Sequence, residues 1–205
     1  MKNINNIVWH KPKVTREMRN ILNGHKSFAF WFTGLPSSGK STIAHLVEKK
    51  LYKKGVRTYT FDGDNIRLGL CSDLGFSEKD REENLRRVAE VINLFLDAGI
   101  VVLAAFVSPL KKHRDKVKQI IGRENFAEIY CRCPVEICEM RDPKGMYKKA
   151  RIGEIKEYTG ISAPYEEPEN PDLIIDTHLL TLDEAVEKVY KFIESKILLS
   201  KENLP

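Results

Sequence analysis

Five short apolar or β-branched runs recur along the chain, and each is followed by a helical pattern or a loop. They span Phe28–Thr33, Val56–Phe61, Ile100–Val107, Phe126–Cys131 and Leu173–Asp176. Strands that alternate with helical segments are typical of a parallel sheet covered by helices on both faces. We therefore expect an α/β fold with a parallel sheet of about five strands.

Helical segments are marked by apolar spacing and by capping residues. Apolar side chains share one face of Ser41–Tyr52, and Ser77 precedes a long periodic segment that reaches Asp97. Thr181 and Glu184 form the pattern of a capping box, which predicts a helix that continues to about Ile197. A short helix is also expected near residues 15–22.

The length of 205 residues and the 42% hydrophobic content fit one domain with a substantial core. We expect an N-terminal arm over residues 1–27 and a single domain over residues 28–200. The N-terminus has no apolar signal-peptide core, and the longest apolar run, Ile100–Val107, is too short to cross a bilayer. These features predict a soluble cytoplasmic protein without a membrane partner.

The net charge of +5 arises from basic residues interspersed with 29 acidic ones, and no aromatic-interleaved basic patch stands out. We therefore expect no nucleic-acid partner; a polyanionic small ligand accounts for the charge equally well. The four cysteines lack C-x-x-C spacing and paired histidines, so buried free thiols are expected rather than a zinc site or disulfides.

A phosphate-binding pattern, G-x-x-x-x-G-K-[ST], follows the first apolar run directly. Its residues are Gly34, Leu35, Pro36, Ser37, Ser38, Gly39, Lys40, Ser41 and Thr42. In such a P-loop, backbone N–H groups surround the phosphates, the lysine reaches the β- and γ-phosphates, and the Ser41 hydroxyl ligates Mg²⁺. The alternative is a glycine-rich turn without a ligand. The strand before it and the helix after it favour binding of ATP or another nucleoside triphosphate.

Ligands of open parallel sheets bind beyond the carboxyl ends of the strands, so residues that follow each run are candidates. Asp62 and Asp64 follow the second run, and Arg67 lies three residues further on. Next to a P-loop, such a carboxylate can act on Mg²⁺ or on an incoming hydroxyl. The alternative is a structural Asp-Gly turn.

Polar residues lie on the inward face of the predicted helix after Ser77. With about 100° of rotation per residue, Arg81 falls near the centre of the apolar stripe and Asn84 near its edge. An inward arginine needs a partner, which is either an anionic substrate or a carboxylate at the edge of the core. Phe76, just ahead, offers an aromatic face for a planar base.

Ser108 and Pro109 follow the third run, and Pro109 suits the first position of a helix. The Ser108 hydroxyl could cap that helix, contact substrate or accept a phosphoryl group; the first two are favoured because no activating base is evident. The densest basic stretch, Arg141–Lys156, is either a solvated helical face or a mobile cover over phosphates.

Together these residues resemble the adenylylsulfate kinase (APS kinase) family over nearly the whole chain. The resemblance is carried by Phe30–Leu35 with Ser38–Thr42, Asp62–Arg67, Gly69-Leu70, Asp73–Ser77, Arg81 with Glu83-Asn84 and Arg86-Arg87, Ser108-Pro109, Arg141–Gly145, Tyr147–Arg151, Gly153–Lys156, Thr159–Ile161 and Pro164–Glu166. It implies a P-loop NTPase-type sheet with a helical lid over about residues 141–160. It also implies transfer of phosphate from ATP, with Mg²⁺, to the 3′-hydroxyl of adenylyl sulfate.

The resemblance also implies roles for individual residues. Lys40, Asp62 and Ser108 would be catalytic, with Asp62 orienting or deprotonating the hydroxyl and Ser108 aligning with a serine sometimes described as a phosphorylated intermediate. Nucleotide would be bound by the P-loop and Arg141. The substrate would be bound by Asp62, Arg67, Phe76, Arg81, Asn84, Val107, Ser108, Lys144 and Tyr158. The family further suggests a homodimer.

Departures from the family pattern and rival functions complete the picture. Pro36-Ser37 stands where the family commonly has Ser-Gly, and Tyr158 replaces a phenylalanine that usually stacks on the substrate adenine. Ser162 replaces a common aspartate. The rivals are another small-molecule P-loop kinase, a GTP-binding switch and a domain that binds nucleotide without turnover. The switch is disfavoured because no N-K-x-D segment is present.

Overall fold

The computed structural model describes residue 8 and residues 10–199, so residues 1–7 and 9 of the expected arm and residue 200 of the expected domain lie outside the described residues. Five strands form one parallel sheet in the order β2-β3-β1-β4-β5. The strands are β1 (Ala29–Thr33), β2 (Thr58–Asp62), β3 (Val101–Ala105), β4 (Phe126–Arg132) and β5 (Leu173–Asp176). The predicted fold class is confirmed.

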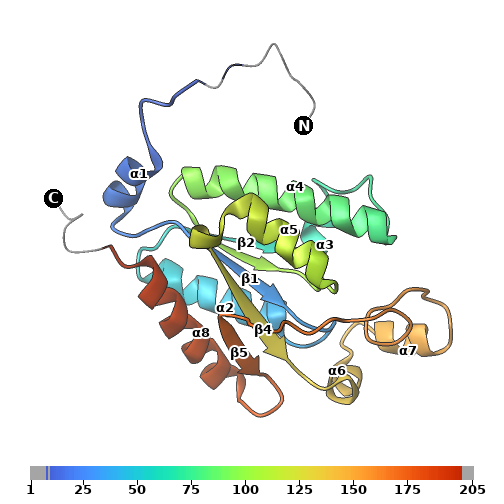
Figure 1. The fold of residues 1–205 in the computed structure, drawn as a ribbon. Coiled ribbons are helices and arrows are strands. Elements are labelled where there is room, and N and C mark those ends of the chain that lie inside the picture. Colours follow the sequence, from blue (N-terminus) through green and yellow to red (C-terminus); the bar gives the residue numbers. More distant parts are fainter. Residues whose placement is uncertain (1–7, 9, 200–205) are drawn as a thin grey trace.

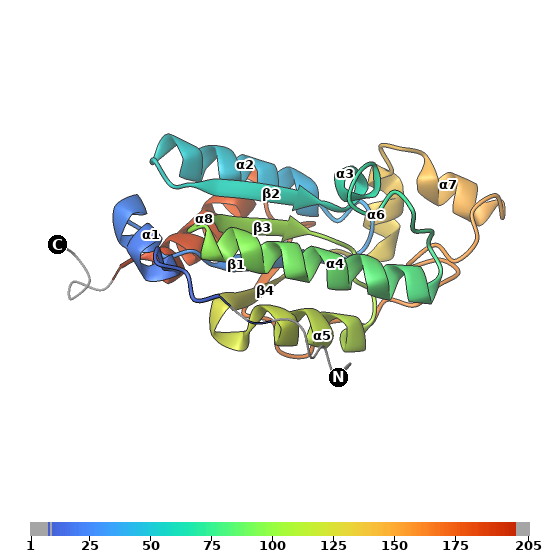
Figure 2. The ribbon, with the colours of Figure 1, turned by 90° about the horizontal axis from the view of Figure 1, so that it is seen from above.

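Helices cover both faces of this sheet, and two short helices extend past one end of it (Figures 1 and 2). The helices are α1 (Arg16–Asn23), α2 (Lys40–Lys53), α3 (Gly63–Arg67), α4 (Glu78–Asp97), α5 (Lys111–Ile121), the 3-10 turn η1 (Arg123–Asn125), α6 (Val135–Arg141), α7 (Met146–Arg151) and α8 (Leu182–Ile197). α2 and α8 pack on one face of the sheet, whereas α4 and α5 pack on the other. None of the helices over the described range could cross a membrane.

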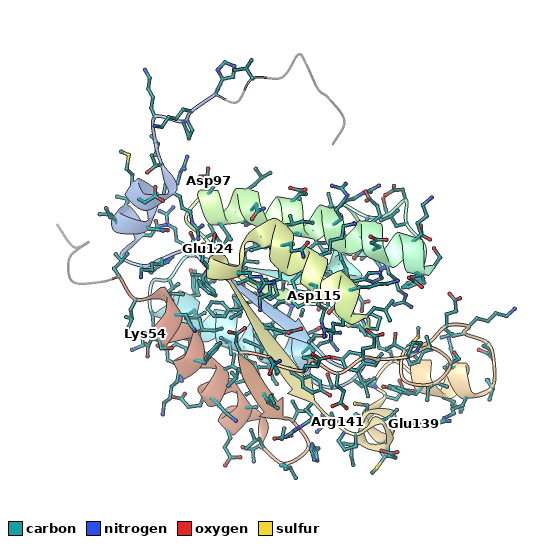
Figure 3. All side chains as sticks on the ribbon, in the orientation of Figure 1. Lys54, Asp97, Asp115, Glu124, Glu139 and Arg141 are labelled. Atoms are coloured by element: carbon teal, nitrogen blue, oxygen red, sulfur yellow. The ribbon has the colours of Figure 1, made fainter. Side chains whose placement is uncertain are left out.

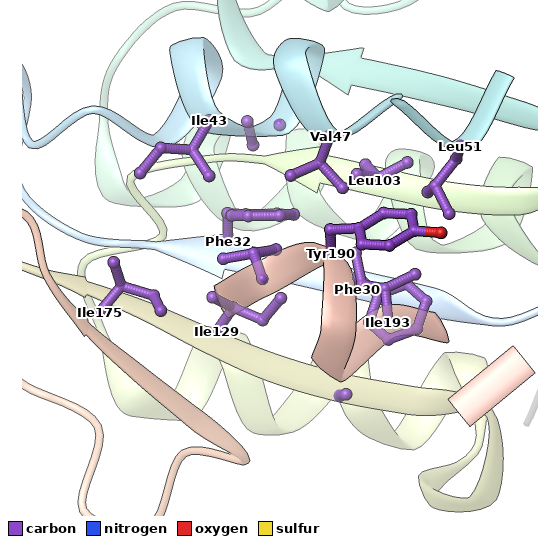
Figure 4. Close-up of a cluster of buried hydrophobic side chains, with 14 of the residues drawn as sticks. Phe30, Phe32, Ile43, Val47, Leu51, Leu103, Ile129, Ile175, Tyr190 and Ile193 are labelled. Carbon is purple, nitrogen blue, oxygen red and sulfur yellow. The ribbon is translucent and has the colours of Figure 1, made fainter. Parts of the chain in front are cut away.

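The central strand β1 is buried along its whole length, and its side chains alternate between two cores. Phe30 and Phe32 enter the core formed with α2 and α8, where Figure 4 shows them among Val47, Leu51 and Ile193. The intervening Trp31 points into the core formed with α4 and α5. Because both faces of β1 are packed, its carboxyl end, where the P-loop begins, is held firmly in place.

The predicted helix starts are mostly confirmed. The hydroxyl of Ser77 caps α4 by accepting from the backbone N–H of Asp80 at 3.2 Å, and Thr181 and Glu184 form the capping box of α8. The position of the helix after β3 was predicted wrongly. It begins at Lys111 rather than at Pro109, and its N-cap residue makes no side-chain capping bond.

Two buried histidines are held in the neutral form. His25 accepts the backbone N–H of Arg57 at Nε2 (3.1 Å), while its Nδ1 faces the Lys26 carbonyl (3.2 Å). His113 lies between α4 and α5, and in the described structure neither of its ring nitrogens has a hydrogen-bond partner. Burial lowers the pKa of both rings; for His113, Glu82 and Glu78 oppose this shift and Lys112 and Lys116 add to it.

These histidines should make the fold sensitive to mild acid. Their pKa values in the unfolded chain lie near 6.5, and the folded values are lower, so below pH 6.5 the unfolded chain binds protons that the folded chain excludes. The free energy of unfolding, measured by urea denaturation, should therefore reach its full value above pH 6.5 and decrease as the pH falls below 6.5. His113→Leu should flatten this dependence, whereas His45→Gln, at an exposed position, should not. An equal slope in His113→Leu and the unaltered protein would contradict this assignment.

Candidate functional site

The predicted site residues gather at the carboxyl ends of the strands. The P-loop follows β1, Asp62 ends β2 and Ser108 follows β3, while α6 and α7 extend past the same edge (Figures 1 and 2). In Figure 3, Glu139 and Arg141 of α6 mark this end of the molecule, whereas Asp97 and Glu124 lie at the other. The topology therefore brings together segments that are far apart in the sequence.

The P-loop backbone requires glycine at its first position. A Cβ on Gly34 would lie 2.6 Å from the Cys131 carbonyl oxygen and 2.7 Å from Ser38 Oγ, and its φ of +151° disfavours any side chain. Ser37 also has a positive φ, of 60°. This is the position where the resemblance pointed to glycine, so the serine here is held in a strained conformation by the packed loop around it.

Lys40 is the first residue of α2, and its ammonium group is buried. Nζ donates to the carbonyl oxygen of Leu35 at 2.6 Å and contacts Ser38 Oγ at 3.4 Å. Within the described residues it forms no salt bridge, and burial lowers its pKa to about 8 despite the opposing influence of Asp62 and Asp64. A buried cation with only neutral hydrogen-bond partners at a helix N-terminus is a strong site for phosphate.

The two aspartates after β2 make different contacts. Asp62 Oδ1 accepts the backbone N–H of Asp64 at 3.0 Å and so caps α3, which is the structural role of the Asp-Gly turn. The Asp64 carboxylate forms an ion pair with Lys144, which lies between α6 and α7 in the segment predicted to be a lid. This pair raises the pKa of Lys144. The lid therefore reaches the second strand end directly.

Arg67, Phe76 and Arg81 form one cluster beside these aspartates. The Arg67 guanidinium lies 4.3 Å from the centroid of the Phe76 ring and donates to the Gly75 carbonyl at 2.7 Å. Arg81 donates to the carbonyls of Phe76 (2.8 Å) and Glu157 (3.2 Å). Its partners here are thus carbonyl oxygens and not the carboxylate that one interpretation expected.

Burial removes water from polar groups in this cluster, and hydrogen bonds within the protein replace only part of that hydration. It lowers the pKa of Arg67 and of Arg81, and for Arg81 the nearby Arg67 lowers it further. Asn84 is 3% exposed, and its side-chain N–H₂ has no hydrogen-bond partner in the described structure. Two partly desolvated arginines and an amide donor without a partner favour the binding of an anion whose oxygens accept hydrogen bonds.

Ser108 is buried and does not cap a helix, so that expectation is wrong. Its Oγ accepts from Trp31 Nε1 at 3.0 Å and donates to Thr33 Oγ1, also at 3.0 Å. Thr33 donates in turn to the Val107 carbonyl at 2.8 Å. Neither partner of the hydroxyl is a base, and Ser108 has a positive φ of 39°, which is a strained conformation for a serine.

Residues 141–160 pack through two aromatic side chains, Tyr147 and Tyr158, and leave their basic face in water. Tyr147 of α7 is fully buried, and its ring meets that of Tyr158 edge-on at 5.0 Å between centroids. Lys148, Lys149 and Arg151 are exposed. The exposed basic side chains fit the interpretation of a solvated helical face, and the cover over phosphates stays a prediction.

Arg141 is held near the P-loop by Thr177, a residue that was not predicted from the sequence to lie at the site. Its guanidinium donates to the Thr177 carbonyl at 2.6 Å and to the hydroxyl at 3.2 Å. The Thr177 methyl lies 4.0 Å from the position of a Cβ on Gly39. Thr177 follows β5, so the same inspection of strand ends would have found it. Within the described residues, no three metal-binding side chains of His, Cys, Asp or Glu cluster together.

Comparison with known proteins agrees with this geometry. The sequence profile of the family described as "Adenylylsulphate kinase" matches residues 26–176. An adenylyl-sulfate kinase of Thermodesulfovibrio yellowstonii is 58% identical over 198 residues, covering 97% of this chain and 99% of the relative.

Solved structures give the same result. The APS kinase CysC of Mycobacterium tuberculosis in complex with AMPPNP and APS has a TM-score of 0.79 and 47% identity, covering 82% of this chain and 98% of that one. The hexameric APS kinase of Thiobacillus denitrificans has a TM-score of 0.63 and 28% identity, covering 85% of this chain and 30% of that one. The chain described here belongs to the adenylylsulfate kinase family.

Proposed function

We propose that this chain transfers the γ-phosphate of ATP to the 3′-hydroxyl of adenylyl sulfate, which yields 3′-phosphoadenylyl sulfate and ADP. The observation that carries the proposal is that two cationic regions lie at the same edge of the sheet. Buried Lys40 lies in the P-loop, and the Arg67–Phe76–Arg81 cluster lies beyond Asp62. Membership of the family supports this choice of acceptor.

The part of the site that would bind ATP, the donor half, consists of the continuous P-loop segment and Arg141. The P-loop residues Gly34 to Thr42 would surround the phosphates, and Lys40 would leave the Leu35 carbonyl to bind the β- and γ-phosphate oxygens. Arg141, held by Thr177 next to Gly39, would contact the nucleoside part.

A magnesium ion fits this donor half. Mg²⁺ is usually held by few protein groups together with waters and phosphate oxygens, so the absence of a metal-binding cluster among the described residues agrees with its chemistry. Ser41 at the start of α2 is the residue that would hold it, with the carboxylates of Asp62 and Asp64 at the end of β2. When bound, the ion neutralises charge on the transferred group.

The acceptor half is assembled from α3, α4, the end of β3 and the lid. Arg67, Arg81 and Lys144 would bind the sulfate and phosphate oxygens, and Asn84 would donate its free N–H₂. Aromatic faces for the adenine come from Phe76 and Tyr158, with Val107 and Ser108 at its side. Asp62 would orient the 3′-hydroxyl or accept its proton, so that the transfer is direct and in line.

The wider organisation follows the same proposal. Residues 1–27 would form an arm, residues 28–200 the catalytic domain and residues 141–160 a lid that excludes water from the transfer. We further propose that the chain is a cytoplasmic homodimer. Sedimentation equilibrium would distinguish two copies from the hexamer of the Thiobacillus denitrificans relative.

The identity of the acceptor can be tested by measuring how the rate of ADP release depends on the substrate that is added. With Mg-ATP, adenylyl sulfate should accelerate ADP release, whereas AMP and gluconate should have little effect because they lack the sulfate–phosphate anhydride that pairs with both arginines. A coupled assay for ADP measures this directly. Equal acceleration by gluconate would favour a rival small-molecule kinase, and bound ATP without any product would favour a binding domain.

Ser108→Ala separates direct transfer from a covalent route. If transfer is direct, the variant should retain activity within about tenfold, since it loses hydrogen bonds to Trp31 and Thr33 but no reacting group. Single-turnover kinetics and a check of the folded state by circular dichroism make the comparison. Complete loss of activity in a folded variant that still binds both substrates would support a phosphoserine instead.

A further inference from the structure

The lid contacts the P-loop through a hydroxyl group that the proposed chemistry does not use. Tyr147 of α7 is fully buried, and its hydroxyl donates to the carbonyl oxygen of Pro36 at 3.0 Å. Burial also raises the pKa of this tyrosine, which therefore remains a neutral donor. A helix of the lid is thus bonded to the main chain of the loop that holds phosphate.

A second contact joins the same two segments through apolar side chains. Leu35 packs against the small cluster of Cys133, Cys138 and Tyr147. It also approaches Gly160 so closely that a Cβ there would lie 2.9 Å from Leu35 Cδ2. The lid therefore holds two consecutive P-loop residues, Leu35 by its side chain and Pro36 by its carbonyl.

These residues also hold the catalytic lysine. Lys40 Nζ donates to the carbonyl of Leu35, which belongs to the peptide group directly before Pro36. The pyrrolidine ring fixes φ of Pro36, so one soft dihedral, its ψ, separates that peptide group from the carbonyl bonded by Tyr147. The Leu35 carbonyl also accepts the backbone N–H of Ser38 at 3.2 Å. Only one free dihedral therefore lies between the bond that Lys40 releases when it turns to phosphate and the bond that Tyr147 makes. The proline at this position is one of the departures from the family pattern.

The other side of the lid contacts Asp64 and, in the acceptor cluster, Arg81. Lys144 pairs with Asp64, and the Glu157 carbonyl accepts from Arg81 at 3.2 Å. One segment, residues 144–160, thus contacts the P-loop at one side and the acceptor cluster at the other. Where such an element couples two binding sites, each ligand changes the affinity for the other by the same factor.

We propose that Tyr147 is a positioning residue that couples the two substrates: its bond to Pro36 links the phosphate-occupied P-loop to the lid arrangement that binds adenylyl sulfate. The inference rests on the proposed function, because it takes adenylyl sulfate as the second ligand. Tyr147 touches neither substrate in this scheme. It acts by keeping the lid in register with the P-loop.

The test measures the affinity for ADP with and without saturating adenylyl sulfate by isothermal titration calorimetry. The ratio of the two dissociation constants is the coupling factor. Tyr147→Phe keeps the ring and the cluster and removes the hydroxyl. The coupling factor should therefore become about fivefold closer to one. The affinity for ADP alone should stay within about twofold of that of the unaltered protein. Tyr190→Phe, which removes a hydroxyl bonded to Glu194 on α8, should leave coupling unchanged.

Pro36→Ser provides a second variant that does not depend on the folding of Tyr147→Phe. It restores rotation about φ in the link and should also reduce the coupling factor, and the double variant should show no larger reduction than either change alone. An unchanged coupling factor in Tyr147→Phe would overturn the proposal, as would a factor of one in the unaltered protein. Equal weakening of ADP binding with and without adenylyl sulfate would mean a purely structural role and would overturn it too. Failure of the unaltered protein to bind adenylyl sulfate would instead refute the proposed function.

Discussion

The buried ammonium group of Lys40 is the feature on which the rest of the site depends. Its partners, the Leu35 carbonyl and Ser38 Oγ, are neutral, and burial lowers its pKa to about 8. A buried cation without a charged partner destabilises the fold. The P-loop tolerates it because β1 and α2 are packed on both sides of the loop. In the proposed function, phosphate oxygens would remove that cost on binding, so burial of the uncompensated charge would favour nucleotide.

The two halves of the site differ in how they are built. The donor half is one segment between β1 and α2, and its geometry is fixed by local requirements such as the close approach of Gly34 to the Cys131 carbonyl. The acceptor half combines α3, the start of α4 and the lid, and its arginines are held by main-chain carbonyls. Within the described structure, residues 144–160 contact the P-loop through Tyr147 and the residues after β2 through Lys144.

The same difference explains what could be predicted from the sequence. Strands, helix caps and the P-loop depend on short-range patterns, and so does the inward direction of Asn84 on α4, which the structure confirms. The partners of Ser108 could not be predicted, because Trp31 and Thr33 lie more than seventy residues away and reach it only through the pairing of β1 with β3. Tyr147 gave no signal of its own, since an aromatic residue in a basic helix is compatible with a core contact of any kind.

Proton uptake on binding of Mg-ATP tests the role of the buried lysine most directly. At pH 8.5 a Lys40 with a pKa of about 8 is largely deprotonated in the free protein, and bound phosphate raises that pKa, so binding must take up protons. Calorimetric heats measured in buffers of different ionisation enthalpy should reveal an uptake of up to roughly three quarters of a proton per nucleotide, which disappears in Lys40→Ala. Heats that are independent of the buffer, or an equal uptake in Lys40→Ala, would contradict the account.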